Sequence, residues 1–299
     1  MSAHVTRIEE SFLRTPAAPS RSAGVPSRGL GTLVALVSGL AAAFVVAPPR
    51  LAASGPAGDL ADRGHLVAAL RTAVLGYWRS GDRTYPPALQ RVVDYWFRFH
   101  LIKGGIAALL LIVLAALAVL LWRTFLHCDG LGMGSRAALV SAGAAVPVLA
   151  LFALAVVMAN IQGAVAPFAS LLPLLMDSTP DASLTGTLAQ AREQLAGSHR
   201  SSGYTPAALD AMVSDFAWYH AALAVVAAVA VVALLGLCVM FWRRFARVGS
   251  ADRRTRRVWG WFGVLSALSS LIVAVVLVAN TGTATDPAPA LLAFFNGGI

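Results

Sequence analysis

The chain has 299 residues, of which 58% are hydrophobic and 12% charged, and its mean hydropathy is +0.73. A soluble domain carries about a quarter charged residues, so this composition excludes an ordinary soluble protein. The apolar residues form five runs, at 30–48, 101–122, 137–159, 221–242 and 258–279. Each run is close to or above the roughly 20 residues that cross a bilayer as a helix. We therefore predict an all-α integral membrane protein with five transmembrane helices.

The net charge of +9 is concentrated in three polar segments. Residues 1–29 carry four Arg and two Glu, 123–136 have a net charge of +1, and 243–258 hold seven Arg and one Asp. Because cytoplasmic segments are enriched in Arg and Lys, this distribution predicts a cytoplasmic N-terminus and an extracytoplasmic C-terminus. It also argues against a nucleic-acid partner. The excess of Arg over a single Lys is typical of a GC-rich bacterial genome and predicts a multi-pass protein of a bacterial plasma membrane.

The third segment predicts contact with anionic lipids at the cytoplasmic face, because clustered cations next to a membrane attract acidic headgroups. A specific acidic partner is the alternative. The arginines concerned are Arg243, Arg244, Arg247, Arg253, Arg254, Arg256 and Arg257.

The N-terminal part of the chain begins with a polar leader. Residues 1–29 are rich in Ser, Pro, Ala and Gly without apolar periodicity, which predicts a disordered cytoplasmic tail. The first transmembrane helix follows at 30–48. Its end also resembles a signal cleavage site at Val45 and Ala47, but the long leader and the adjacent Pro48 favour an uncleaved helix.

Two segments between the apolar runs show helical periodicity. In the predicted extracytoplasmic loop 49–83, apolar residues recur every four positions from Leu66 to Trp78, which predicts an amphipathic helix. Residues 180–203 hold a second amphipathic helix, followed by a linker. Together these segments predict an extracytoplasmic helical cap over the bundle.

The remaining chain is an internal tandem repeat of 120 residues. Repeat 1 spans 84–179 and contains the helices at 101–122 and 137–159, and repeat 2 spans 204–299 and contains those at 221–242 and 258–279. The matched residues include Pro86 with Pro206, His100 with His220, Trp122 with Trp242, Asn160 with Asn280, and Pro167 with Pro287. Identities of such uncommon residues in so apolar a chain indicate a duplication.

Four of the duplicated residues are the candidate site: His100, His220, Asn160 and Asn280. All four are predicted near the outer boundary of the membrane, with Asn160 and Asn280 at the ends of their helices. If the two His side chains faced one cavity, they could bind a metal, a small polar ligand or an acidic side chain of a partner. Alternatively, the Asn residues cap their own helices and the His residues lie at the interface, which is a structural role.

The sequence contains no recognisable catalytic, cofactor-binding or metal-binding motif, so no catalytic residue, cofactor or metal ligand is predicted. The polar residues at mid-membrane depth are serines, which commonly serve helix packing. These observations favour a non-catalytic scaffold or accessory subunit of a membrane complex, whose partner is a membrane protein or a second copy of the chain. The alternatives are a permease or export component, and a membrane-embedded enzyme acting on a lipid-like substrate.

Overall fold

A computed structural model of the chain describes residues 27–54, 58–127, 132–176, 182–198 and 206–297. All described elements are helical. The predicted tail at 1–29 lies outside the described residues apart from 27–29, which begin the first helix. Residues 199–203 of the predicted linker lie outside them as well.

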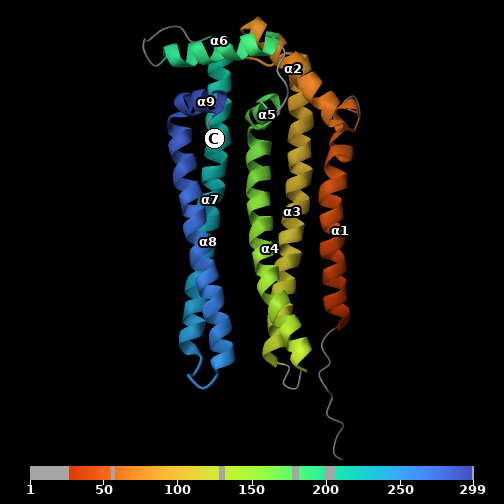
Figure 1. Ribbon diagram of the computed structural model, residues 1–299, viewed down its shortest axis with the longest axis vertical. Coiled ribbons are helices and arrows are strands. Elements are labelled where there is room, and N and C mark those ends of the chain that lie inside the picture. The colour runs from red at the N-terminus through yellow and green to blue at the C-terminus, as the bar shows by residue number, and fades with distance from the viewer. Residues whose placement is uncertain (1–26, 55–57, 128–131, 177–181, 199–205, 298–299) are drawn as a thin grey trace, which may run out of the picture.

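Within the described residues, five helices are long and apolar enough to cross a membrane. They are α1 (Ser27–Ala52), α3 (Pro87–His127), α4 (Met133–Val165), α7 (Ala207–Arg247) and α8 (Arg253–Thr285). They lie side by side along the long axis of the molecule (Figure 1). Each contains one of the five predicted apolar runs, and the five helices indicate a multi-pass membrane protein.

The helices extend beyond the apolar runs that predicted them. The segment after Pro87 continues without a break into the apolar part of α3. The prediction that Asn160 and Asn280 end their helices is wrong, because α4 and α8 continue to Val165 and Thr285. The turn comes instead at the residue that precedes a proline, where the α conformation is disfavoured.

Those two turns have nearly the same backbone conformation. Ala166 has φ −129° and ψ 74°, and Asp286 has φ −135° and ψ 74°. Each is followed at once by a short apolar helix, α5 (Pro167–Met176) or α9 (Pro287–Phe295). We call α3–α5 hairpin 1 and α7–α9 hairpin 2. The helices α3 and α7 have 41 residues each and α4 and α8 have 33 each.

The short helices gather at one end of the molecule. Helices α2 (Arg63–Ser80) and α6 (Ala182–Ser198) lie across that end, with α5 and α9 beside them (Figure 1). We call the 3-10 turn η1 (Gly58–Ala61), these four helices and the first turns of α3 and α7 the end layer. Both predicted amphipathic helices are present, and the first stops at Gly81 in the left-handed conformation, with φ 66°.

The main hydrophobic core lies in the end layer rather than between the long helices. One cluster of 27 buried apolar residues joins α2, α5, α6 and α9 to the starts of α3 and α7. Between the long helices, the described clusters contain six and three buried residues. The end layer therefore holds the two hairpins together much as the core of a soluble domain would.

Along the bundle, the helices within each hairpin pack on each other, and α1 packs on α3. Hairpin 1 meets hairpin 2 where Met158 of α4 contacts Ala227 and Ala230 of α7. Small residues at this contact let the two helix backbones approach closely, which is the usual basis of helix association in membranes. Opposite the end layer, at the basic end, α1 begins, α3 and α7 end, and α4 and α8 begin (Figure 1).

Candidate functional site

The four candidate residues, His100, Asn160, His220 and Asn280, form two hydrogen-bonded pairs, one in each hairpin. His100 Nδ1 lies 3.0 Å from Asn160 Oδ1, and His220 Nδ1 lies 2.8 Å from Asn280 Oδ1. In each hairpin the His comes from the first long helix and the Asn from the second. The structure thus brings together residues 60 positions apart in the chain, in the same way in both hairpins.

The hydrogen bonds of the Asn side chains determine the His tautomer. Asn160 Nδ2 donates to the carbonyl oxygen of Val156 at 2.8 Å, and Asn280 Nδ2 donates to that of Val276 at 2.8 Å. Each Asn oxygen therefore faces the imidazole and accepts a hydrogen bond from Nδ1–H. In the neutral imidazole, Nε2 is then a hydrogen-bond acceptor. The Asn residues do satisfy a carbonyl of their own helix, but within the helix and not at its end.

The two imidazoles differ in what covers them. The His100 ring lies against Gly163, where an added Cβ would be 2.6 Å from His100 Cε1. His100 Nε2 is buried and has no hydrogen-bond partner among the described residues. The position equivalent to Gly163 in hairpin 2 is Thr283, which lines a cavity of about 370 Å³ together with His220. The same pair is thus closed in hairpin 1 and open in hairpin 2.

The cavity beside His220 lies between the hairpins. Its walls include Ala169, Leu172 and Pro173 of α5 as well as residues of α7, α8 and α9. His220 lines it, whereas His100 is enclosed within hairpin 1 by Trp96, Phe99 and Gly163. Among the described residues, no group of three or more His, Cys, Asp or Glu side chains could hold a metal ion. The arrangement accordingly offers one open imidazole beside an apolar cavity.

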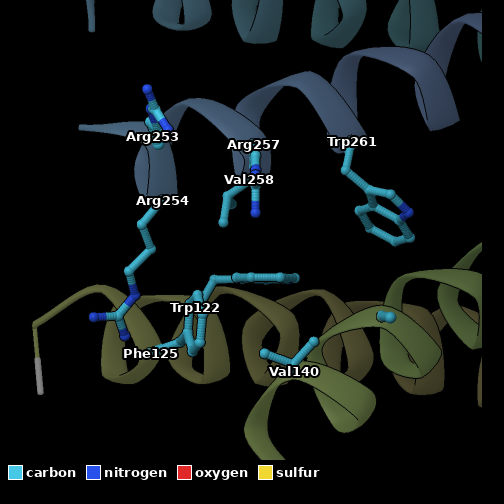
Figure 2. A pocket seen from close by; sticks show the side chains of 9 residues that line it. Trp122, Phe125, Val140, Arg253, Arg254, Arg257, Val258 and Trp261 are labelled. Atoms are coloured by element: carbon cyan, nitrogen blue, oxygen red, sulfur yellow. The ribbon is translucent and has the colours of Figure 1, made fainter. Parts of the chain in front are cut away.

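A second candidate site lies at the basic end. A groove of about 560 Å³ separates the start of α8 from the end of α3 and the start of α4. We call it the basic groove, and it is lined by Trp122, Phe125, Val140, Ala144, Arg253, Arg254, Arg257, Val258 and Trp261. Figure 2 shows the α8 side chains facing α3 and α4 across this space, with Arg254 and Arg257 extending toward α3. Arg253 lies at the rim, with its guanidinium turned away (Figure 2).

The spacing of residues along α8 explains why several of its side chains line the same groove. Arg254, Arg257, Val258 and Trp261 follow one another at intervals of three, one and three residues, so Arg254–Val258 and Arg257–Trp261 are each four apart and all four lie on one face of the helix. Asp252 starts the helix by accepting a hydrogen bond from Thr255 N at 3.0 Å. Hydrogen bonds from Thr255 to this exposed carboxylate lower the pKa of Asp252.

Aromatic rings hold several of the basic side chains. The guanidinium carbon of Arg254 lies 4.0 Å from the centre of the Phe125 ring, which belongs to hairpin 1. Arg256 lies over Phe245 at 4.5 Å and Arg244 over Trp259 at 4.9 Å, both within hairpin 2. These distances are in the range of cation–π attraction. The seven arginines predicted as one cluster therefore do not share one environment: Arg254 contacts a ring of hairpin 1, whereas Arg244 and Arg256 contact rings of hairpin 2.

The remaining arginines of the cluster, Arg243 and Arg247, are exposed near the end of α7 and do not line the basic groove. Arg253 and Arg257 also border a neighbouring hollow of about 310 Å³ with Phe245, Ser250 and Arg256. Two of the seven arginines, Arg254 and Arg257, thus extend into the basic groove, Arg253 lies at its rim, and the other four lie elsewhere on the same end.

Sequence reasoning did not foresee the contribution of hairpin 1 to the basic groove. From the sequence, Trp122 stood out only by its match to Trp242 at a spacing of 120 residues. In the structure its indole packs on Gly143 of α4, and Nε1 donates to the Gly143 carbonyl oxygen at 2.9 Å. Trp242 packs in the same way on Gly263. The signal was available in the sequence, because Gly143 and Gly263 are also 120 residues apart.

The chain matches no protein-family model, and neither the curated proteins nor the solved structures include a protein with significant similarity to it.

Proposed function

We propose that the protein is a non-catalytic scaffold or accessory subunit of a complex in a bacterial plasma membrane. Its partner is a membrane protein or a second copy of the chain, and it docks on the end layer. In this proposal the N-terminus is cytoplasmic, the C-terminus is extracytoplasmic, and the end layer is the extracytoplasmic cap.

The distribution of charge supports this orientation. The cationic segment 243–258, with seven Arg, lies at the end of the molecule opposite the end layer (Figure 1). Positive residues stay on the cytoplasmic side of a membrane, so the basic end faces the cytoplasm. Since α1 begins at that end, the same assignment leaves the N-terminal segment inside the cell.

The helix boundaries support a tandem duplication. The helices α7, α8 and α9 begin at Ala207, Arg253 and Pro287, each 120 residues after the start of its counterpart in hairpin 1. The His–Asn hydrogen bond and the packing of a Trp on a Gly occur in both hairpins. A repeated hairpin is a natural building unit for a membrane scaffold, because each copy adds a pair of spans and a piece of the end layer.

One observation carries the scaffold proposal: among the described residues, the largest hydrophobic core is in the end layer and not between the spans. Burial of 27 apolar side chains there joins seven α-helices, because the cluster also includes Ala52 at the end of α1. The outer surface of α6, by contrast, is exposed and built from small and polar residues, among them Ala189 and Glu193. A firmly packed layer whose outer face is exposed leaves that face accessible to a partner.

Affinity purification in a mild detergent tests this proposal. We expect a stoichiometric protein partner, or a homo-oligomer, to co-purify with the wild-type chain. The double variant Ala189→Arg/Glu193→Arg should lose it, since two long cations on the outer surface of α6 would disturb a docking surface without affecting the core. A control variant, Ser250→Arg at the basic end, should retain the partner. A monomeric wild-type protein without a partner, or equal losses in both variants, would contradict the proposal.

A further inference from the structure

The basic groove combines features that together define a class of ligand. It lies at the basic end, it contains guanidinium groups and indole rings, and both hairpins contribute to its walls. We propose that this groove binds one anionic phospholipid, whose phosphate meets Arg254 and Arg257 while an acyl chain lies along the apolar wall. This inference goes beyond a scaffold function and is independent of the partner.

The charge at the start of α8 is the first argument. Four arginines occupy the first five positions of the helix, and the capping residue Asp252 is the adjacent acid. The N-terminus of a helix carries a partial positive charge, so cations in the first turns are unfavourable there. A bound phosphate would offset both the helix dipole and the arginine charges. Arg is also the residue best suited to bind phosphate, because its planar donors engage two oxygens at once.

The apolar wall distinguishes a lipid from a free phosphate ion. Trp122, Trp261, Val140, Ala144 and Val258 provide most of the surface next to the two guanidinium groups. A free phosphate ion gains nothing from contact with apolar side chains, whereas a phospholipid carries an anionic group and a hydrocarbon chain side by side. The volume of about 560 Å³ is within the usual range for ligand sites, roughly 300–1,000 Å³.

The groove is also open to lipid on its apolar side. Val140 of α4 is 40% exposed and Trp261 of α8 is 37% exposed, and both belong to helices that could cross a membrane. Indole rings favour the headgroup level of a bilayer, which matches the depth at which a phosphate would meet Arg254 and Arg257. A lipid could therefore enter from the surrounding membrane without leaving the bilayer.

Such a lipid would connect the hairpins. Its phosphate would be held by α8 of hairpin 2, and its chain would touch Trp122 and Val140 of hairpin 1. Direct contacts already join the hairpins here, since Trp122 lies 5.5 Å from Phe262 and 6.4 Å from Trp261 between ring centres. Lipid binding would therefore stabilise the association of the hairpins at the end that lacks a large core.

The test measures thermal stability and lipid retention of the delipidated full-length protein with four additions. These are phosphatidylglycerol, phosphatidylcholine, inorganic phosphate and a neutral detergent. We expect only phosphatidylglycerol to raise the melting temperature and to remain bound in native mass spectrometry. Brominated acyl chains on the same lipid should quench tryptophan fluorescence, and Trp261→Phe should weaken that quenching.

Two double variants separate the groove from general electrostatics. Arg254→Gln/Arg257→Gln should weaken phosphatidylglycerol binding about 25-fold, since each arginine near an anionic surface contributes roughly fivefold. Arg243→Gln/Arg247→Gln removes the same charge from the same end but outside the groove, and should change binding less than about threefold. Arg254→Lys, which retains the charge and loses the two-pronged donor, checks that the geometry matters and should weaken binding measurably.

Three results would overturn the proposal. Equal losses in the two double variants would show that only the total charge matters. Stabilisation by inorganic phosphate equal to that by phosphatidylglycerol would show a site for a free anion. Stabilisation by phosphatidylcholine as large as that by phosphatidylglycerol would show that the arginines do not select an anionic headgroup.

Discussion

The contact between His100 and Gly163 gives the sharpest prediction for stability. In Gly163→Ala, the new methyl group would lie 2.6–2.8 Å from three atoms of the His100 ring, closer than real contacts allow. The ring has little room to move away, because Nδ1 is held by Asn160 at 3.0 Å and Trp96 lies 5.0 Å away between ring centres. Overpacking costs about 1–3 kcal/mol, and loss of an interhelical hydrogen bond in a membrane costs about 0.6 kcal/mol. We expect a total loss of about 2–3 kcal/mol.

Equilibrium unfolding in mixed detergent and SDS micelles, followed by tryptophan fluorescence, measures this loss. The matched control is Thr283→Ala at the equivalent position of hairpin 2, where the wild type already carries a Cβ. Its hydroxyl donates to the Ala279 carbonyl within the same helix, so we expect a change below about 0.5 kcal/mol.

A double-mutant cycle identifies the cause. If the clash with the imidazole produces the loss, Gly163→Ala should cost much less in a His100→Ala background than in the wild type. An equal cost in both backgrounds, or no cost in either, would refute the proposed closed packing of His100.

On a cysteine-free background, a cysteine at Ser202 should react with an impermeant reagent from outside the cell, and one at Ser250 only after permeabilisation; the reverse pattern would contradict the orientation. Desolvation raises the pKa of Tyr77 to about 12 from 10.0. The folded protein therefore favours the neutral phenol, and the resulting contribution to stability is complete below pH 10 and is lost as the pH rises through 12. Tyr77→Phe should accordingly flatten the fall in melting temperature that begins near pH 10. Asp215 caps α5 by accepting from Ala169 N at 2.7 Å. Asp215→Ala should cost about 0.5–2 kcal/mol and Asp215→Asn less, and equal costs would argue against the cap.

The sequence predicted the long helices well because their signals are local. An apolar run of sufficient length has few alternatives to a membrane-spanning helix, and a proline pair such as Pro86-Pro87 marks a helix start. The positions of the turns were less evident. We expected Asn160 to end its helix because polar residues often do so, but the backbone turns at Ala166, where Pro167 imposes it.

The candidate sites depended on information that is not local. The spacing of 120 residues singled out His100 and Asn160, yet it gave no indication that they would bond to each other, since that depends on how α3 and α4 pack. The basic groove was still harder to foresee. Its arginines were recognised as a cluster, but Trp122 and Phe125 come from the other hairpin, and only the tertiary arrangement places them opposite Arg254.

In-cell photo-crosslinking tests the central claim that the end layer is a docking platform. A photoreactive residue at Ala189 or Glu193 lies on the exposed surface of α6, and the same residue at Val229 or Ile272 lies on exposed apolar positions of α7 and α8 as a control. We predict one discrete protein adduct from both α6 positions and none from the two control positions. No adduct from α6, or the same adducts from all four positions, would contradict the account.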